Sequence, residues 1–329
     1  MRRLGVVVLV LIGLAAAGAP WLSPNSPVQR FEDLQFAPPT AIHLFTPDGF
    51  APHIYPWRLV NRLERRFEAA GDRPSRLRWR TGGALVSADP DGGAPLLLLG
   101  ADGYGRDVFA RLLHGARITL GLAALATFGA VLLGSFIGGV SGFIGGPVDA
   151  AVSRVSEFVL VLPSMYVALS LRAVMPLVLP ASVVFMTLML VFTVLGWPIV
   201  ARGVRGVVLS EREQEYVQAA RASGAGSLRI LVRHVLPAAR GYVLNQVTLL
   251  LPAFIVAEAT MSYIGLGFPD TTPTWGTMLR ESSNVALLGD APWTLAPAAS
   301  IFLVVLAVHA VSGSGDARGD VRGPVQLRG

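Results

Sequence analysis

Six long apolar runs constrain the fold of this chain more than any other feature of its sequence. A transmembrane helix needs about 20 predominantly apolar residues to cross the hydrocarbon core of a bilayer, and its backbone polar groups must be satisfied within the segment. Six segments reach that length, at residues 4–22, 118–144, 150–174, 177–200, 241–264 and 293–311. The sequence therefore predicts an all-α polytopic membrane protein with six transmembrane helices.

The composition argues against several kinds of catalytic chemistry. Of the 329 residues, 53% are hydrophobic and 15% are charged, which is more apolar than a single soluble core needs. Cysteine and lysine are both absent, so the chain can contain neither a thiolate nucleophile nor a Walker A lysine. We expect no catalytic residue, no cofactor and no metal site, and any ATP that drives the protein must be hydrolysed by another chain.

The first apolar run allows two interpretations. Arg2 and Arg3, the run itself and the small residues Ala17 to Ala19 resemble a secretory signal with its cleavage site. A retained anchor is favoured, because the later runs already place the chain in the membrane. Residues 1–22 are therefore predicted to be an N-terminal transmembrane anchor whose N-terminus is cytoplasmic.

Arginines in the short loops indicate the orientation, because cytoplasmic loops are enriched in them. The loop at residues 201–237 contains six arginines, which are Arg202, Arg205, Arg212, Arg221, Arg229 and Arg233. A seventh, Arg240, follows the loop closely. This loop is predicted to be cytoplasmic, as is the tail at 313–329. Both termini then lie inside, residues 23–116 lie outside as a small insertion between spans 1 and 2, and residues 117–312 form the transmembrane core.

The outer segment differs from the rest in composition. It is rich in proline, and the run from Arg58 to Glu68 predicts an amphipathic helix, because Leu59, Leu63 and Phe67 recur at helical spacing. Residues 89–95 form a turn-rich break. We expect a partly irregular extracytoplasmic domain, for which the sequence indicates no function.

The cytoplasmic loop predicts two short helices joined at a glycine. A polar stretch leads through alanines to Ser223 and Gly224, where a helix is expected to stop. Ser227 can cap a second helix that runs through Val235 and ends before Pro237. The small alanines would let another protein approach closely, although a solvated connection fits the spacing equally well.

The same loop carries a resemblance to a known family. Residues 215–224, followed by 233–237, resemble the Glu-Ala-Ala loop of binding-protein-dependent ABC importer permeases. That motif reads Glu-Ala-Ala, three residues, Gly, nine residues, Ile, one residue, Leu-Pro. In this chain Gln218 replaces the glutamate and His234 replaces the isoleucine. The resemblance implies that the loop docks on an ATPase through Gln218, Ala219, Ala220, Gly224, Leu236 and Pro237.

Further landmarks are similar to the six-span subunit of dipeptide and oligopeptide permeases. They are residues 99–107, 115–117, 162–164, 265–267 and 273–276. Ala101 stands where threonine is usual, and residues 312–320 lack the leucines of the family's closing run. The resemblance implies one half of a peptide pathway in a bacterial inner membrane. Its implied partners are a second permease subunit, two ATP-binding cassette ATPases and an extracytoplasmic substrate-binding protein.

Within the spans, two kinds of residue attract notice. Gly134, Gly138 and Gly142 recur every four residues, a spacing that lets helices approach closely within one subunit or between two. Charges at membrane depth are costly and often functional. Glu258 is therefore a possible pathway residue, whereas Glu157 can pair with Arg154 on its own helix.

Other functions fit the sequence less well. The same machinery could carry nickel chelates or sugars. An ion-coupled secondary transporter would be expected to show two pseudo-symmetric halves with interrupted spans, and an intramembrane enzyme would need a nucleophile with its base or a metal set. Neither pattern is present. Nucleic acid is not expected as a partner despite the net charge of +6, because the arginines lie between apolar runs, where lipid headgroups account for them.

Overall fold

The computed structural model describes most of the chain. The described residues are 1–46, 49–62, 64–71, 74–80, 83–88, 94–163, 166, 167, 169, 170, 174, 176, 179–283 and 289–312. They form two compact units, each described by itself. The first unit contains residues 122–258 with both chain ends, and the second contains residues 3–121 and 259–307.

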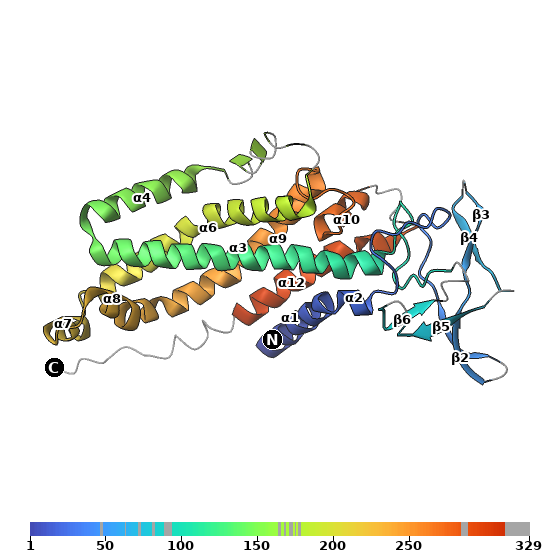
Figure 1. The fold of residues 1–329 in the computed structure, drawn as a ribbon, viewed down its shortest axis with the longest axis horizontal. Coiled ribbons are helices and arrows are strands. Elements are labelled where there is room, and N and C mark those ends of the chain that lie inside the picture. Colours follow the sequence, from blue (N-terminus) through green and yellow to red (C-terminus); the bar gives the residue numbers. More distant parts are fainter. Residues whose placement is uncertain are drawn as a thin grey trace, which may run out of the picture. The chain divides into compact units, whose positions relative to one another are not determined.

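Within the described ranges, four helical stretches are long and apolar enough to cross a membrane (Figure 1). They are α3 (Val108–Ile144), α6 (Ala181–Glu211), the stretch Ser227–Ile264 and the stretch Pro292–Ser312, which ends in α12 (Ala296–Ser312). They confirm helices at the second, fourth, fifth and sixth predicted spans. Three of the four extend by ten or more residues beyond the predicted bounds, because backbone hydrogen bonding continues where the apolar run has ended.

The first and third predicted spans correspond to shorter helices. α1 (Arg2–Ala17) and α4 (Gly146–Val161) have 16 residues each, and α1 is followed by the single turn α2 (Ala19–Leu22). Part of the third predicted span, at residues 164, 165, 168 and 171–173, lies outside the described residues. The count of six spans therefore remains a prediction.

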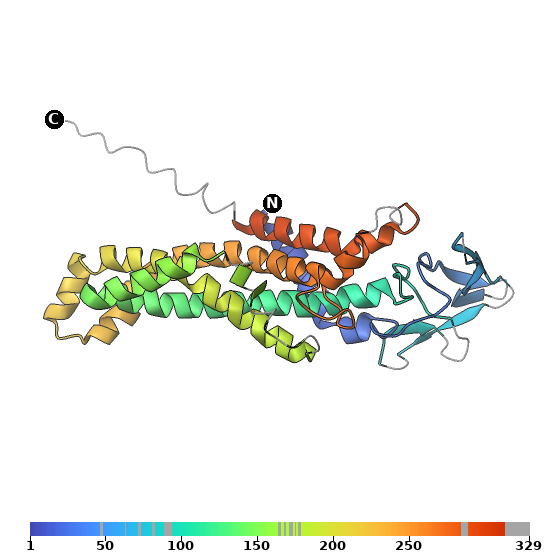
Figure 2. The same ribbon diagram turned by 90° about the horizontal axis from the view of Figure 1, so that it is seen from above.

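In the first unit, the glycine pattern lies where α3 packs on α6. A Cβ added at Gly138 would lie 2.3 Å from the Ala201 carbonyl oxygen, and one at Gly142 would lie 3.0 Å from the Arg205 carbonyl oxygen. Only glycine permits this approach of the two backbones. The pattern thus serves packing within this chain. α4 lies beside α6 in the same unit, as both ribbon views show (Figures 1 and 2).

The second unit contains all the described strands. Four form an antiparallel sheet in the order β1 (Ile42–Thr46), β2 (Gly49–Ile54), β5 (Ser75–Trp79) and β6 (Val86–Ala88). β3 (Trp57–Asn61) and β4 (Arg66–Ala69) form a separate hairpin. Between α2 and α3 the chain is therefore a small β domain, so the all-α description holds only for the rest of the chain.

The amphipathic helix predicted from Arg58 to Glu68 is wrong. Leu59 and Phe67 face each other across the β3–β4 hairpin, and Leu63 lies outside the described residues. Phe67 packs beside a small core formed by Leu34, Ala37, Leu97 and Ala101. Spacing alone cannot separate these arrangements, because apolar residues on one face of a hairpin can fall at helical intervals by chance. Most of the turn-rich break, at residues 89–93, lies outside the described residues.

Candidate functional site

The predicted glycine elbow is formed by α7 (Glu215–Ala222). The helix stops at Ser223, and Gly224 has φ +81°, in the left-handed region. The Gly224 amide donates to the Arg221 carbonyl at 3.0 Å, and the Ala225 amide donates to the Ala220 carbonyl at 3.1 Å. This pair of bonds is a Schellman motif, which favours glycine because a residue with a Cβ is strained at a left-handed φ. The predicted stop at Gly224 is confirmed.

The exposed face of α7 carries small side chains. Val217 is the only buried residue of the helix. Gln218 and Ala219 are exposed, and Ala220 is half-buried. The side-chain amide of Gln218 (Nε2) donates to the Glu213 backbone carbonyl at 3.1 Å. The residue that replaces the family's glutamate therefore stabilises the turn before the helix. Ala219 and Ala222 thus leave small exposed positions on α7, between larger exposed side chains such as Gln218 and Arg221.

Contacts that sequence reasoning missed hold α7 to its neighbours in the first unit. The Tyr216 hydroxyl donates to Glu211 Oε2 at 2.5 Å, and this bond raises the pKa of Tyr216 to about 12. The Arg221 guanidinium lies 5.7 Å from the centre of the Phe143 ring. Arg212 donates to the Gly142 carbonyl at 2.9 Å. The elbow is therefore anchored to the ends of both α6 and α3.

The second predicted helix begins as expected but does not end before Pro237. Gly226, not Ser227, is the N-cap of α8 (Ser227–Ile230). A π-helix over Leu231–Val235 and a 3₁₀ turn over Leu236–Ala239 then lead directly into α9 (Arg240–Ile264). Pro237 is tolerated because it lies in the first turn of the 3₁₀ segment, where its missing amide hydrogen is not needed.

The predicted coupling residues therefore form two groups. Gln218, Ala219, Ala220 and Gly224 lie together on α7 and its cap. Leu236 and Pro237 are half-buried in the helical stretch that follows. A Cβ at Gly139 of α3 would lie 2.9 Å from Leu236 Cδ2, so Leu236 packs against α3. Leu236 therefore contributes to packing against α3 and not to the exposed surface of α7.

The charged residues predicted at membrane depth have different environments. Glu258 is fully buried in α9 and has an interaction partner. Between the two described residues Arg154 and Glu157 the structure records no ion pair, so the predicted local pair is not formed. Instead Asp149 at the start of α4 accepts two hydrogen bonds from Arg205 of α6, at 2.5 and 2.6 Å.

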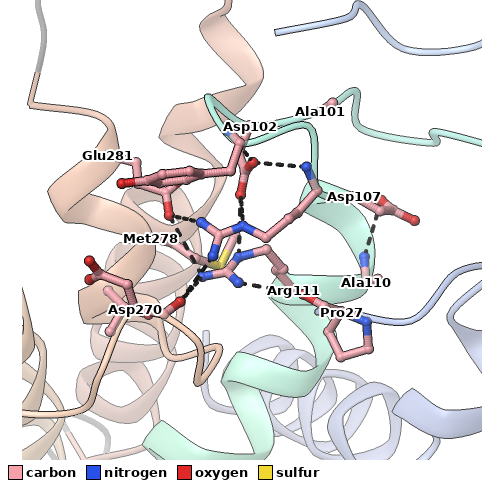
Figure 3. Close-up of polar contacts among 12 residues, drawn as sticks. Pro27, Ala101, Asp102, Asp107, Ala110, Arg111, Asp270, Met278 and Glu281 are labelled. Atoms are coloured by element: carbon pink, nitrogen blue, oxygen red, sulfur yellow. Dashed lines mark hydrogen bonds and ion pairs between the residues drawn. The ribbon is translucent and has the colours of Figure 1, made fainter. Parts of the chain in front are cut away.

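The second unit contains a buried ion cluster, defined by Asp102, Arg106, Arg111 and Glu281; Figure 3 labels Asp102, Arg111 and Glu281. The Asp102 and Arg106 side chains are 5% and 2% exposed, and Arg106 Nε donates to Asp102 Oδ2 at 2.8 Å. Arg106 also bonds Glu281 at short distance. Arg111 Nε lies 3.5 Å from Asp102, and Arg111 Nη2 lies 3.7 Å from Glu281. Two guanidinium groups thus face two carboxyl groups, and all four side chains are largely buried.

The ion cluster joins two stretches that the sequence analysis treated as separate landmarks. Glu281 ends α10 (Trp275–Glu281), whose N-terminus is closed by a capping box between Thr274 and Thr277. The indole of Trp275 donates to the Leu112 carbonyl at 3.1 Å. Burial, with the nearby charge of Asp102, raises the pKa of Glu281 to about 7. Residues 102–112 and 270–281 are therefore held together as one structural element.

These features define a class of protein. Long apolar helices with glycine-mediated packing, and an exposed small-residue elbow between two of them, are typical of a polytopic membrane transport subunit. Residues 130–314 match the family described as binding-protein-dependent transport system inner membrane component, and the chain belongs to this family. Members are the membrane-spanning subunits of ABC importers, and separate ATPase partners hydrolyse the ATP. The chain is therefore a non-catalytic permease of the inner membrane.

Several characterised relatives resemble this chain over about two thirds of its length. The oligopeptide transport system permease protein OppC of Bacillus subtilis (strain 168) is 36% identical over 66% of this chain and 68% of that protein. The dipeptide transport system permease protein DppC of the same strain is 36% identical over 68% of each chain. DppC of Alkalihalophilus pseudofirmus is 34% identical over 64% of this chain and 67% of that protein. The structure of the methionine ABC transporter MetNI in inward facing conformations is 20% identical, with a TM-score of 0.48 over 63% of this chain and 94% of that chain.

Proposed function

We propose that this chain forms half of the translocation pathway of a peptide importer and receives the movement of its ATPase through α7. The observation that carries the proposal is the elbow, which presents the exposed Ala219 beside the half-buried Ala220 and ends at Gly224 in the left-handed conformation that glycine adopts at little cost. The peptide class is supported by relatives that are named as oligopeptide and dipeptide permease proteins. Nickel chelates and sugars are the alternative cargoes.

The proposed assembly has four protein partners besides the lipid bilayer. A second permease subunit would complete the pathway, and two ATPases would bind on the cytoplasmic side, one of them to α7 of this chain. An extracytoplasmic binding protein would deliver the peptide. Nucleotide-driven closure of the ATPases would bias the bundle between two states, with α7 as the point of contact. Glu258, which is buried in α9, is the candidate pathway residue.

The proposed topology keeps six spans with both termini in the cytoplasm. Residues 1–22 would anchor the chain, and residues 23–116 would form an extracytoplasmic domain between spans 1 and 2. The permease core would be residues 117–312, with a cytoplasmic coupling loop at 201–237 and a cytoplasmic tail at 313–329. α6 extends helically into that loop as far as Glu211, which is consistent with an arm that projects beyond the bilayer.

A matched pair of glycine substitutions tests the elbow in the reconstituted complex. A Cβ at Gly224 or at Gly226 would meet nothing within 4 Å, but only Gly224 has a positive φ, whereas Gly226 has φ −67°. Gly224→Ala therefore strains the cap by about 1–2 kcal/mol, and Gly226→Ala does not. We expect the first to reduce ATP hydrolysis stimulated by the loaded binding protein, and the second to leave it unchanged.

A surface substitution separates docking from folding. Ala219→Arg places a large side chain on the exposed face of α7, and Ala238→Arg places the same side chain on the exposed part of the 3₁₀ turn. The first should prevent the ATPase from co-purifying, and the second should not. If ATPase binding and stimulation survive Ala219→Arg, α7 is not the coupling helix. Testing peptides, nickel chelates and sugars as ligands of the binding protein in the same assay identifies the cargo.

A further inference from the structure

A polar cavity lies between α3, α4 and α6 in the first unit. Its volume is about 170 Å³, and its polar lining residues are Ser141, Ser153, Ser156, Glu157, Arg202 and Arg205. A single water needs only roughly 10–15 Å³ of such volume, so the cavity has room for a group of several heavy atoms. Neither the coupling elbow nor the ion cluster includes any of these residues.

The lining carries opposite charges that do not neutralise each other. Arg205 is already held by Asp149 through two hydrogen bonds. Glu157 and Arg202 line the same cavity, yet among the described residues neither forms an ion pair. A carboxylate in a partly enclosed site favours a cationic donor, and a guanidinium favours anionic oxygens. The cavity therefore suits a group that carries both charges.

Serine hydroxyls complete the lining. On α4, Ser153, Ser156 and Glu157 are spaced at i, i+3 and i+4, so they share the face that turns to the cavity. Ser141 is fully buried on α3 and donates to the Gly138 carbonyl at 3.3 Å. Its oxygen still has lone pairs that can accept from a ligand N–H. A primary ammonium, with three hydrogens to donate, matches this arrangement better than a methylated one.

The position of the cavity along α6 places it at headgroup level. Arg202 follows the first residue of α6, Ala181, by 21 positions, which corresponds to about 32 Å of helix. The hydrocarbon core of a bilayer is about 30 Å thick, so a helix that enters near Ala181 leaves it near Arg202. Beside the cavity, Val155 and Phe158 of α4 are 53% and 67% exposed. Their apolar surface can accommodate an acyl chain.

We propose that this cavity binds the headgroup of an aminophospholipid such as phosphatidylethanolamine. Arg202 contacts the phosphate, and Glu157 with the serine hydroxyls receives the ammonium. The acyl chains lie along the apolar side of α4. A free dipeptide carries the same two charges, but the depth of the cavity and the exposed apolar residues beside it favour the lipid.

Native mass spectrometry of the purified complex tests the site through a ratio of bound lipids. The complex is delipidated and offered phosphatidylethanolamine together with phosphatidylcholine, which has the same phosphate but a trimethylated ammonium, and separately with phosphatidylglycerol. We expect phosphatidylethanolamine to be bound about tenfold more than either. A preference measured within one sample does not depend on the amount of folded protein.

Three variants assign the preference to residues. Glu157→Gln should abolish the preference for phosphatidylethanolamine over phosphatidylcholine, and Arg202→Gln should lower the binding of both. Arg154→Gln is the matched control, because Arg154, like Glu157 and Arg202, is charged and exposed but does not line the cavity. An unchanged ratio in Glu157→Gln, an equal effect of Arg154→Gln, or displacement of the lipid by glycylglycine would each overturn the proposal.

Discussion

Two arginine pairs in the second unit have similar distances but opposite environments, and they should differ sharply in what they contribute to stability. Arg106 and Asp102 are 2.8 Å apart with side chains 2% and 5% exposed. Arg62 and Asp33 are 2.9 Å apart with side chains 79% and 72% exposed. The perturbation is Arg106→Gln, with Arg62→Gln as its matched control. The two substitutions remove the same side chain, so burial is the main variable.

The structure gives the expected magnitudes. Without Arg106, the carboxylates of Asp102 and Glu281 would face only Arg111, at 3.5 and 3.7 Å. Breaking a buried ion pair leaves an uncompensated charge and costs about 3–5 kcal/mol, whereas an exposed pair contributes about 0.2–1 kcal/mol. For domains of 150–250 residues, about 2–4 °C of melting temperature corresponds to 1 kcal/mol. Arg106→Gln should therefore lower the melting temperature by roughly 6–20 °C, and Arg62→Gln by at most about 4 °C.

The assay is the loss of the monodisperse peak of a fluorescently tagged protein in size-exclusion chromatography after heating. The double variant Asp102→Asn with Arg106→Gln supplies a second comparison. It leaves Arg111 and Glu281 as a balanced pair, so it should lose less stability than the sum of the two single variants. Equal shifts for Arg106→Gln and Arg62→Gln, or strict additivity in the double variant, would refute the reasoning.

Glu281 and the glycines of α3 allow two further tests of stability and packing. Burial and the charge of Asp102 raise the pKa of Glu281 from 4.5 to about 7. Because the folded state then binds this proton more tightly than the unfolded state, the melting temperature should fall as the pH rises from 4.5 to 7. Glu281→Gln should reduce this dependence of the melting temperature on pH. Gly138→Ala should lower the yield of folded protein, since its Cβ would lie 2.3 Å from a carbonyl oxygen of α6. Gly121→Ala, on the same helix, should not lower the yield, because a Cβ at Gly121 would meet nothing within 4 Å. Equal yields of the two variants would contradict the packing argument.

The features that could be predicted from the sequence are those set by local chemistry. Four of the six predicted apolar runs correspond to helices of the described residues that are long and apolar enough to cross a membrane, because lipid imposes both length and composition. Gly224 could be identified as a helix stop because only glycine enters the left-handed region of a Schellman cap at little cost. The position of Gln218 and Ala219 on one short helix follows from the same local rule.

The features that were missed depend on partners far along the chain. Arg106 and Glu281 are 175 residues apart, and nothing in either landmark shows that they pair. Leu59 and Phe67 were assigned to a helix because their spacing fits one, but their cross-strand pairing is decided by the core they cover. Pro237 was expected to end a helix, yet the π and 3₁₀ turns around it redirect the hydrogen bonds that it cannot make.

The connections of α7 bear on whether the elbow can transmit force. Only residues 212–214 separate it from α6, and Arg212 in that gap is bonded to the Gly142 carbonyl of α3. On the other side, residues 223–226 lead into a helical stretch that continues without a break from Ser227 to Ile264. A flexible linker would absorb a displacement of α7, whereas these short connections pass it to two apolar helices. Gly224, with its left-handed φ, is then the point where the angle between the helices can change, and rigidity elsewhere is what makes this position matter.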